Sequence, residues 1–424
     1  MNNTATVLEA AVSCPIRAAA ELDAPTFERI RRTLMLDHCK WDSQVGDVTT
    51  LAAFPLVISA TEWRSLAAWA EQLSAELFDI EQYLLHAPHL QRTLNVPAVV
   101  REIFEDAPDA ASPAAARVMR FDFHYTPSGW QISEVNSDVP GGFSEASSFT
   151  ALMAQAYPHL RVCGDPVSRW ADALLATSAG APIALLSAPG YMEDQQILAY
   201  LRQALASRGC AGYLCEPSQL RWEDGRASLR SNYYSGPLGA VVRFYQGEWL
   251  ANLPERTGWR KLFAGAETPV ANPGSALLTE SKRLPLIFDD LPDSISTSAC
   301  RRFFPETRDP RDVNWEDDAA WLLKTAFCNT GDTVAIRELL PASKWNEVVR
   351  DVRRSPHDWL AQRRFETVAV VSPLGPIYPC IGVYTINAKA AGVYARISTQ
   401  PIIDFTAIDA ALLVEEEEGV LHTR

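Results

Sequence analysis

The sequence has few cysteines, and no two of them have the close spacing of a metal-binding or redox motif. Its eight cysteines are scattered over 424 residues, form no Cys-x-x-Cys pair, and have no histidine cluster beside them at zinc-binding spacing. Scattered cysteines in a chain of this length indicate reduced thiols. The pattern argues against a zinc site and predicts a cytoplasmic protein.

Long apolar runs are also missing. No window approaches the roughly 18 uninterrupted apolar residues of a membrane-spanning helix. The first residues lack the charged region and apolar stretch of a signal peptide. No internal repeat or low-complexity tract is present. We therefore expect no membrane partner.

Basic residues are outnumbered, with 38 Lys and Arg against 52 Asp and Glu, which gives a net charge of -14 at pH 7. Such a field repels phosphate backbones, so we expect no nucleic-acid partner. An acidic protein can still bind ATP where positive groups gather locally and a metal ion shields the phosphates. We interpret the acidic run at residues 415–418 as a solvated surface feature.

The first part of the chain is predicted to be mainly helical. At residues 61–73 apolar side chains recur at helical spacing, and Thr61 is the expected N-cap. A short apolar stretch at 118–123 and an alternating stretch at 130–135, separated by a Pro-Ser-Gly turn, predict a β-hairpin. A helix is expected over 144–157.

Further strands follow, first in a strand–helix–strand unit with a parallel sheet and later near the C-terminal end. In the first unit a helix at 192–208 connects the strands at 182–188 and 212–215. The other expected strands are 239–245, 367–371, 376–387 and 392–398. Helical segments occupy parts of 279–355. This order predicts an α/β (α+β) enzyme with several lobes and argues against a helical bundle or a sandwich.

Polar residues on the two hairpin strands have the chemistry of a metal site. Residues two apart on a strand point to the same face, so Glu134 and Asn136 project together, and Asp122 can lie beside them across the strand pair. Mg²⁺ takes a few such protein oxygens and completes its octahedron with water and substrate phosphates. This face could therefore hold Mg²⁺ bridged to ATP, with Arg120 close by.

Two other interpretations of the same residues are open. They could occupy the solvated face of an exposed hairpin, which is the usual place for charged side chains. Alternatively, Asp122 and Glu134 could form the acid and base pair of a glycoside hydrolase, although nothing else in the chain indicates sugar chemistry.

The order of these motifs resembles a known family. Arg-Phe-Asp at 120–122, Glu-Val-Asn at 134–136, Asp-Val-Pro at 138–140 and Glu-Ala from Glu145 resemble the metal-binding core of glutathionylspermidine synthases. Those enzymes are circularly permuted ATP-grasp ligases, in which the Glu-x-Asn pair precedes the nucleotide lysines, as it does here.

Further segments resemble the same family in the same order, between about residues 118 and 405. They are 243–250, 271–284, Trp-Leu-Leu-Lys at 321–324, Trp-Leu-Ala-Gln at 359–362 and a closing hairpin at 382–396. The resemblance implies ATP and Mg²⁺ as cofactors. It implies metal ligands Asp122, Glu134 and Asn136, nucleotide-binding residues Lys282, Lys324, Gln362 and Arg396, and catalytic residues Arg120 and Arg396.

Several of these residues also have a purely structural interpretation. Lys282 could be a surface residue of a helix, Arg396 could belong to a structural ion pair, and Gln362 could satisfy core backbone groups. Lys324 follows an apolar Trp-Leu-Leu run, so it requires a partner, because burying a bare charge is costly.

The resemblance also implies a domain organisation. The expected parts are a mainly helical region at 1–117, a metal-binding hairpin and helix at 118–175, a βαβ lobe of pre-ATP-grasp type at 176–265, and the nucleotide-binding part of the ATP-grasp core at 266–424. Two departures from the family are visible. No amidase with a Cys-His pair is expected in the N-terminal region, and the phosphate-covering loop at 327–333 has one glycine and no arginine.

The sequence thus predicts an ATP- and Mg-dependent ligase that joins a small-molecule carboxylate to an amine through an acyl phosphate. ATP-grasp chemistry asks the protein mainly for positioning and charge neutralisation. We expect alanine at Asp122, Glu134 or Asn136 to weaken Mg-ATP binding without unfolding the protein. The alternatives are a non-catalytic ATP-grasp-like nucleotide-binding or scaffold protein and a small-molecule kinase.

Overall fold

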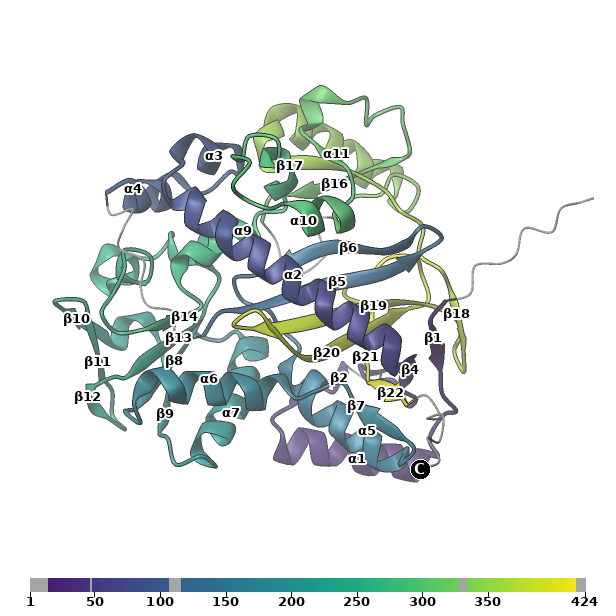
Figure 1. Ribbon diagram of the computed structural model, residues 1–424, viewed down its shortest axis with the longest axis horizontal. Coiled ribbons are helices and arrows are strands. Elements are labelled where there is room, and N and C mark those ends of the chain that lie inside the picture. Colours follow the sequence, from purple (N-terminus) through teal and green to yellow (C-terminus); the bar gives the residue numbers. More distant parts are fainter. Residues whose placement is uncertain (1–13, 46–47, 107–115, 328–333, 417–424) are drawn as a thin grey trace, which may run out of the picture.

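The computed structural model describes residues 14–45, 48–106, 116–327 and 334–416. Its centre is an antiparallel sheet in the order β21-β20-β19-β5-β6, with β18 beside β19 (Figure 1). The strands of this sheet are β5 (Val118–Thr126), β6 (Gly129–Asn136), β18 (Val370–Ser372), β19 (Gly375–Ile386), β20 (Lys389–Ser398) and β21 (Ile408–Ala410). The predicted hairpin is therefore confirmed, and it pairs with a second hairpin from the C-terminal part of the chain.

Helix α2 (Ala60–Leu85) crosses one face of the central sheet (Figure 1). Its apolar side chains recur at helical spacing and are buried, among them Leu66 and Leu73. The Ser59 hydroxyl caps the helix by accepting a hydrogen bond from the Glu62 amide at 3.1 Å. The expected cap at Thr61 is wrong, because the helix begins one residue before that position.

A parallel sheet in the order β14-β13-β8-β9 forms the predicted βαβ lobe. Its strands are β8 (Ile183–Ser187), β9 (Gly212–Cys215), β13 (Ala240–Phe244) and β14 (Val270–Ala271). Helices α6 (Pro166–Ser178) and α7 (Met192–Ala206) pack against it. A small antiparallel sheet of β10 (Leu220–Glu223), β11 (Arg226–Arg230) and β12 (Ser235–Pro237) extends this lobe.

A third sheet has the order β15-β17-β16, from β15 (Thr307–Arg308), β16 (Trp321–Thr325) and β17 (Trp359–Arg363). The apolar residues on one face of β16 and β17, including Trp321 and Leu323, pack with Trp345 of α11 (Ala342–Arg354). The opposite face carries Lys324 and Gln362. This alternation turns two polar side chains toward the central sheet.

The N-terminal region is helical but also contributes strands. Its elements are β1 (Ile16–Ala18), α1 (Ala24–Asp37), β2 (Gln44–Val45), β3 (Val48–Thr49), β4 (Leu56–Ser59), α3 (Pro88–Thr93) and α4 (Ala98–Asp106). Strands β1 and β4 join β7 (Leu160–Val162) and β22 (Leu412–Glu415) in one sheet. Chain segments from both ends are therefore paired, while the domain boundaries drawn from sequence stay predictions.

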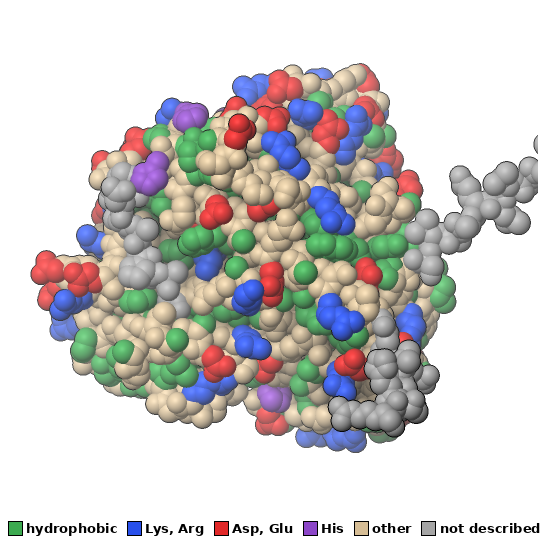
Figure 2. Space-filling model, in the orientation of Figure 1, with side chains coloured by type: hydrophobic (Ala, Val, Ile, Leu, Met, Phe, Trp, Pro, Cys, Tyr) green, Lys and Arg blue, Asp and Glu red, His purple; other side chains and the backbone are tan. Residues whose placement is uncertain are grey.

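Short helices connect these layers. They are the π-helical turn η1 (Glu145–Phe149), α5 (Thr150–Ala156), α8 (Gly247–Leu250), α9 (Leu277–Glu280) and α10 (Ser298–Phe303). In the described part of the chain no helix is long and apolar enough to cross a membrane. The cysteines of the same part are free thiols. On the face seen in Figure 2, acidic and basic side chains are interspersed.

Candidate active site

The two faces of strand β5 have different surroundings. Met119 and Phe123 face helices, since the Ser74 hydroxyl of α2 lies 3.5 Å from the Met119 sulfur and the rings of Phe123 and Phe303 lie 5.8 Å apart. Arg120 and Asp122 alternate with them and point to the other face. Both are buried, and Asp122 is 0% exposed. The interpretation of this hairpin as an exposed, solvated element is therefore wrong.

Asp122 is the meeting point of three predicted site residues. Arg120 binds it with two hydrogen bonds, Nε to Oδ1 at 2.7 Å and Nη2 to Oδ2 at 2.9 Å. Arg396, on β20, donates to Oδ2 at 2.7 Å, and the Asn136 amide donates to the same oxygen at 3.3 Å. The structure thus brings Arg120, Asp122, Asn136 and Arg396 together.

The ionisation of Asp122 follows from these contacts. Burial alone would raise its pKa, but the guanidinium groups of Arg120 and Arg396 outweigh burial and lower the pKa to about 2. A carboxyl group with that pKa holds no proton at neutral pH. Asp122 is therefore unsuited to the general-acid role that a glycoside hydrolase would require of it.

A β-bulge sets the position of Glu134. Phe121 pairs with Val135, whereas Phe123 pairs with Ile132, so Ser133 and Glu134 together stand opposite Asp122. The Glu134 side chain, 19% exposed, lies 3.6 Å from the Lys282 ammonium (Oε2 to Nζ). Glu134 is thus the more accessible of the two predicted metal carboxylates.

The sequence suggested that Lys282 lies in a helix, but it does not. It lies two residues beyond the end of α9, its amide donates to the Ala326 carbonyl at 2.9 Å, and its side chain is only 8% exposed. The interpretation of Lys282 as an ordinary surface lysine is therefore wrong. Its position instead brings a cation beside Glu134.

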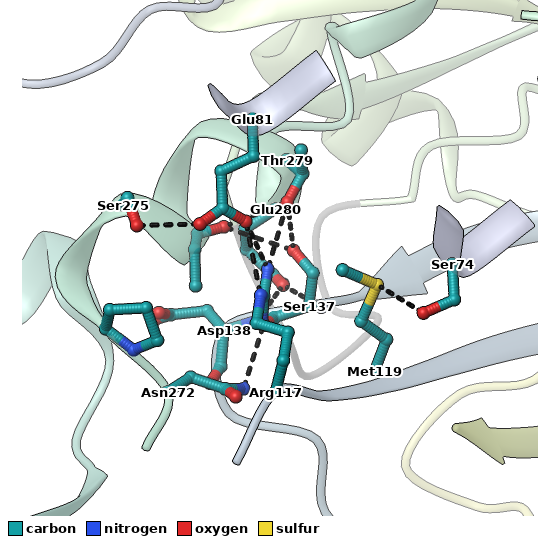
Figure 3. A network of polar contacts seen from close by, with 12 residues as sticks. Ser74, Glu81, Arg117, Met119, Ser137, Asp138, Asn272, Ser275, Thr279 and Glu280 are labelled. Atoms are coloured by element: carbon teal, nitrogen blue, oxygen red, sulfur yellow. Dashed lines mark hydrogen bonds and ion pairs between the residues drawn. The ribbon is translucent and has the colours of Figure 1, made fainter. Parts of the chain in front are cut away.

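A buried polar network fixes the segment that carries Lys282 (Figure 3). The carboxylate of Glu280 accepts hydrogen bonds from the amides of Ser137 and Asp138 at 2.6 and 2.9 Å. The Ser137 hydroxyl lies 3.0 Å from the Thr279 hydroxyl. Because Ser137 follows the last residue of β6, these contacts tie α9 to the end of the strand that holds Glu134 and Asn136.

Burial raises the pKa of Glu280 to about 8, which yields a test of this network. A carboxyl whose pKa is raised in the folded state stabilises the fold below its unfolded pKa and loses that effect as pH rises toward the folded value. The variant Glu280→Gln cannot ionise at this position and therefore lacks this pH dependence. As pH rises from about 5 to 8, wild type should lose up to about 1.4 kcal/mol of unfolding free energy per pH unit relative to the variant. Urea unfolding at several pH values measures it, and a difference that is constant with pH would contradict the assignment.

A pocket opens between the central sheet and the β15-β17-β16 sheet, with a free volume of about 840 Å³ including its open mouth. Its polar lining residues are His124, Ser133, Glu134, Lys324, Gln362, Arg364, Thr367 and Arg396. The apolar ones are Leu322, Val334, Ile336, Phe365, Pro401, Ile402 and Ile403, with Tyr378 and Cys380 beside them.

Lys324 is buried in the wall of this pocket, and its ammonium donates to the Ser133 carbonyl at 2.8 Å. Burial is the main reason that its pKa falls to about 8, although Glu134 opposes the shift. Gln362 lies beside it, buried, with its amide 3.3 Å from the Thr307 hydroxyl. The cations Lys324 and Arg396 therefore reach one pocket from two different sheets.

Sequence reasoning missed some residues of this site. His124 lines the pocket, lies 3.0 Å from the Ser133 hydroxyl (Nε2 to Oγ), and is held neutral because burial lowers its pKa to about 4. Its position two residues after Asp122 was a usable signal. The loop at 327–333, compared above with the family's phosphate-covering loop, lies outside the described residues apart from Phe327.

Close packing around the Arg120–Asp122 pair requires a glycine on β19. A Cβ atom at Gly382 would lie 2.9 Å from the Arg120 side chain, from Asp122 Oδ1 and from the Tyr394 carbonyl. We expect Gly382→Ala to lower the free energy of unfolding by about 1–3 kcal/mol through overpacking. Gly141→Ala is a matched control, since nothing lies within 4 Å of its added Cβ. Equal urea midpoints for the two variants would contradict this packing.

The family model for the glutathionylspermidine synthase pre-ATP-grasp region matches residues 49–411. The chain belongs to this family. The resemblance drawn from the Arg-x-Asp and Glu-x-Asn motifs is thereby confirmed, and the family assignment points to a ligase of ATP-grasp type.

A solved structure supports the fold, and a second, weaker match was also found. A glutathione synthetase-like effector from Globodera pallida, determined without ligand, superposes with a TM-score of 0.58 at 13% identity, covering 92% of this chain and 98% of that one. A putative gamma-glutamylcysteine synthetase from Methylobacillus flagellatus KT gives a TM-score of 0.42 at 11% identity, covering 77% and 83% of the two chains. No curated protein matches the chain. The α+β fold of ATP-grasp type is confirmed.

Proposed function

We propose that this member of the glutathionylspermidine synthase family is an ATP- and Mg-dependent ligase that joins a small-molecule carboxylate to an amine. The observation that carries the proposal is the pocket in which Lys324 and Arg396 meet beside Glu134. In this chemistry the carboxylate substrate accepts the terminal phosphoryl group of ATP, and the amine then displaces phosphate from the acyl phosphate. The protein supplies position and compensating charge, with no covalent nucleophile.

The pocket fits a nucleotide. Aliphatic and aromatic side chains such as Leu322 and Phe365 form a wall suited to a base, while Lys324 and Arg396 provide charge for phosphates. The buried amide of Gln362 provides hydrogen-bonding groups near that wall. Arg120 is not part of the pocket lining but binds the same carboxylate, Asp122, as Arg396 does.

The predicted metal ligands fit Mg²⁺ unequally. Glu134 is on the pocket wall and faces a lysine at 3.6 Å, so its carboxylate can take a cation. Both oxygens of Asp122 accept hydrogen bonds, and three donors converge on Oδ2. Glu134 and Asn136 are the residues we propose for Mg²⁺, and Asp122 would join them only if Arg396 turned away. Among the described residues no group of three or more His, Cys, Asp or Glu side chains is placed to hold a metal.

A ligand-dependent melting experiment tests the nucleotide site. We expect the melting temperature to rise with Mg-ATP and with Mg-ADP, and the rise to be lost when EDTA removes the metal, because ligands of the native state raise apparent stability. No shift at millimolar nucleotide would contradict the proposal and favour a non-catalytic ATP-grasp-like protein.

Product analysis then tests the reaction. Acids and amines are screened in pairs for ADP release that requires both substrates, and products are identified by mass spectrometry. An amide with ADP and phosphate supports the ligase. A stable phosphate ester that hydroxylamine does not cleave, unlike an acyl phosphate, indicates a small-molecule kinase, and ADP release that no substrate stimulates counts against both.

A further inference from the structure

A buried charge cluster lies next to the site, and of its members only Glu145 belongs to a segment compared above with the family. Its centre is Lys40, which follows helix α1 in the N-terminal region and has a side chain that is 4% exposed. The ammonium lies 2.8 Å from Asp42 Oδ1 and 3.1 Å from Asp409 Oδ2, and it also contacts the Glu145 carboxylate. One lysine thus joins its own loop, the π-helical turn η1 and strand β21.

Fold stability alone is a weak reason for such a cluster. Burying an ammonium and carboxylates carries a desolvation penalty, and well-packed apolar residues would often stabilise a core equally well. The contacts with Lys40 instead fix the orientation of the carboxylate side chains in the cluster. Asp409 is the informative one, because Oδ2 contacts Lys40 while its other oxygen, Oδ1, accepts a hydrogen bond from the Tyr394 hydroxyl at 2.7 Å.

Tyr394 connects the cluster to the two site arginines. Its ring centre lies 5.2 Å from the Arg120 guanidinium carbon and 5.5 Å from that of Arg396, within range of cation–π attraction. The ring also lies against Gly142, where an added Cβ would be 2.5 Å from a ring carbon. The ring therefore has little room to move.

The position of this ring matters because the two guanidinium groups repel each other. Both donate to the same oxygen of Asp122, at 2.9 and 2.7 Å. A single carboxylate does not neutralise two cations, and the electron-rich face of Tyr394 contributes the remaining attraction. Arg120 also donates to the Gly141 carbonyl at 2.7 Å, in the segment just before η1, whose Glu145 contacts Lys40.

We propose that Lys40 is a positioning residue, which acts through Asp409 and Tyr394 to fix the guanidinium groups of Arg120 and Arg396 beside Asp122. The N-terminal region would then contribute to the pocket from which it is otherwise separate. The expected effect on nucleotide binding rests on the proposed function, whereas the placement of the arginines does not.

The decisive variants are Tyr394→Phe, which removes the hydroxyl and keeps the ring, and Lys40→Met. We expect each to weaken Mg-ATP binding, measured by calorimetry, by about tenfold or more, as is usual when a supporting partner of a site residue is lost. Lys389→Met is the control, because Lys389 is exposed and pairs only with Glu71 at 3.1 Å in the described structure. The double variant should bind no more weakly than Lys40→Met alone, since both changes break one link.

A second readout needs no nucleotide. In protein labelled with ¹⁵N-arginine, the side-chain NMR signals of Arg120 and Arg396, assigned from Arg→Lys variants, should shift in Tyr394→Phe and in Lys40→Met and stay in place in Lys389→Met. Unshifted signals in Tyr394→Phe would overturn the proposal, and so would additive losses in the double variant.

The two readouts also separate this proposal from the proposed function. If wild type binds no Mg-ATP, the ligase proposal fails and the arginine signals alone decide the role of Lys40. If Lys40→Met does not fold, Tyr394→Phe carries the test by itself.

Discussion

Replacing Lys324 with methionine should weaken Mg-ATP binding by at least about 30-fold, the effect of losing one hydrogen bond of about 2 kcal/mol to a charged group. Methionine keeps the length of the side chain and removes its charge. The ammonium is buried in the pocket wall and, among the described residues, its hydrogen-bond acceptor is the Ser133 carbonyl, at 2.8 Å. A phosphate group would meet this cation in a medium where water competes little.

The fold should tolerate this change. Burial lowers the pKa of Lys324 to about 8, which means that desolvation destabilises the charged form in the free protein. An apolar side chain does not carry this desolvation cost. We therefore expect the melting temperature without nucleotide to stay the same or to rise. Calorimetric titration with Mg-ATP measures the affinity.

Two further variants make the result for Lys324 specific. Lys344→Met removes an exposed lysine paired with Glu347 on α11 and should bind as wild type does. Lys324→Arg keeps the charge and should retain part of the affinity. Unchanged binding in Lys324→Met would exclude this side chain from the nucleotide site and leave Arg364 and Arg396 as the cations of the pocket lining.

Much of this site could be predicted because its signals are local in sequence. The alternation along β5 and β6 set the two faces of the hairpin, and the apolar run before Lys324 indicated a buried strand on which a cation needs a partner. The order of motifs indicated the family. The first two inferences use residues within a few positions of one another, where strand geometry is fixed by the backbone, and each motif of the family is equally short.

The remainder depends on contacts between residues that are distant in sequence. Register within a hairpin cannot be deduced from alternation alone, so the bulge that places both Ser133 and Glu134 opposite Asp122 was invisible. Lys40 meets Asp409 across more than 360 positions, with no motif at either end. Tyr394 lay inside a matched segment, but nothing local distinguished it from a packing residue.

Asp122 shows how the surroundings change the meaning of a motif residue. The spacing of Asp122, Glu134 and Asn136 indicated three equivalent metal ligands. In the folded chain the first is a buried counter-ion for two arginines, whereas Glu134 is partly open to the pocket. The expectation that alanine leaves the fold intact stays a prediction for Glu134, and we revise it for Asp122.

Asp122→Asn should lower the free energy of unfolding by about 3–5 kcal/mol, because it leaves two guanidinium groups together without their carboxylate. The position is 0% exposed, so water cannot take over that role in the intact fold. Arg396, which is 22% exposed, can turn toward the pocket and relieve part of the cost. Urea unfolding measures the loss, and Glu134→Gln, at a 19% exposed side chain, should stay within about 1 kcal/mol of wild type.

The origin of that loss can be checked with a second substitution. If unpaired charge is the cause, Arg120→Met combined with Asp122→Asn should cost less than the sum of the two single variants, since one of the repelling cations is gone. Additive losses would indicate that packing around Gly382, and not charge, makes Asp122 necessary. A non-additive result would mean that the repulsion between Arg120 and Arg396, and their common attraction to Asp122, determine where the two guanidinium groups lie. An anionic ligand that draws Arg396 away would then remove one of the three donors from Asp122 Oδ2, and a metal ion at this oxygen would still have to displace Arg120 and Asn136.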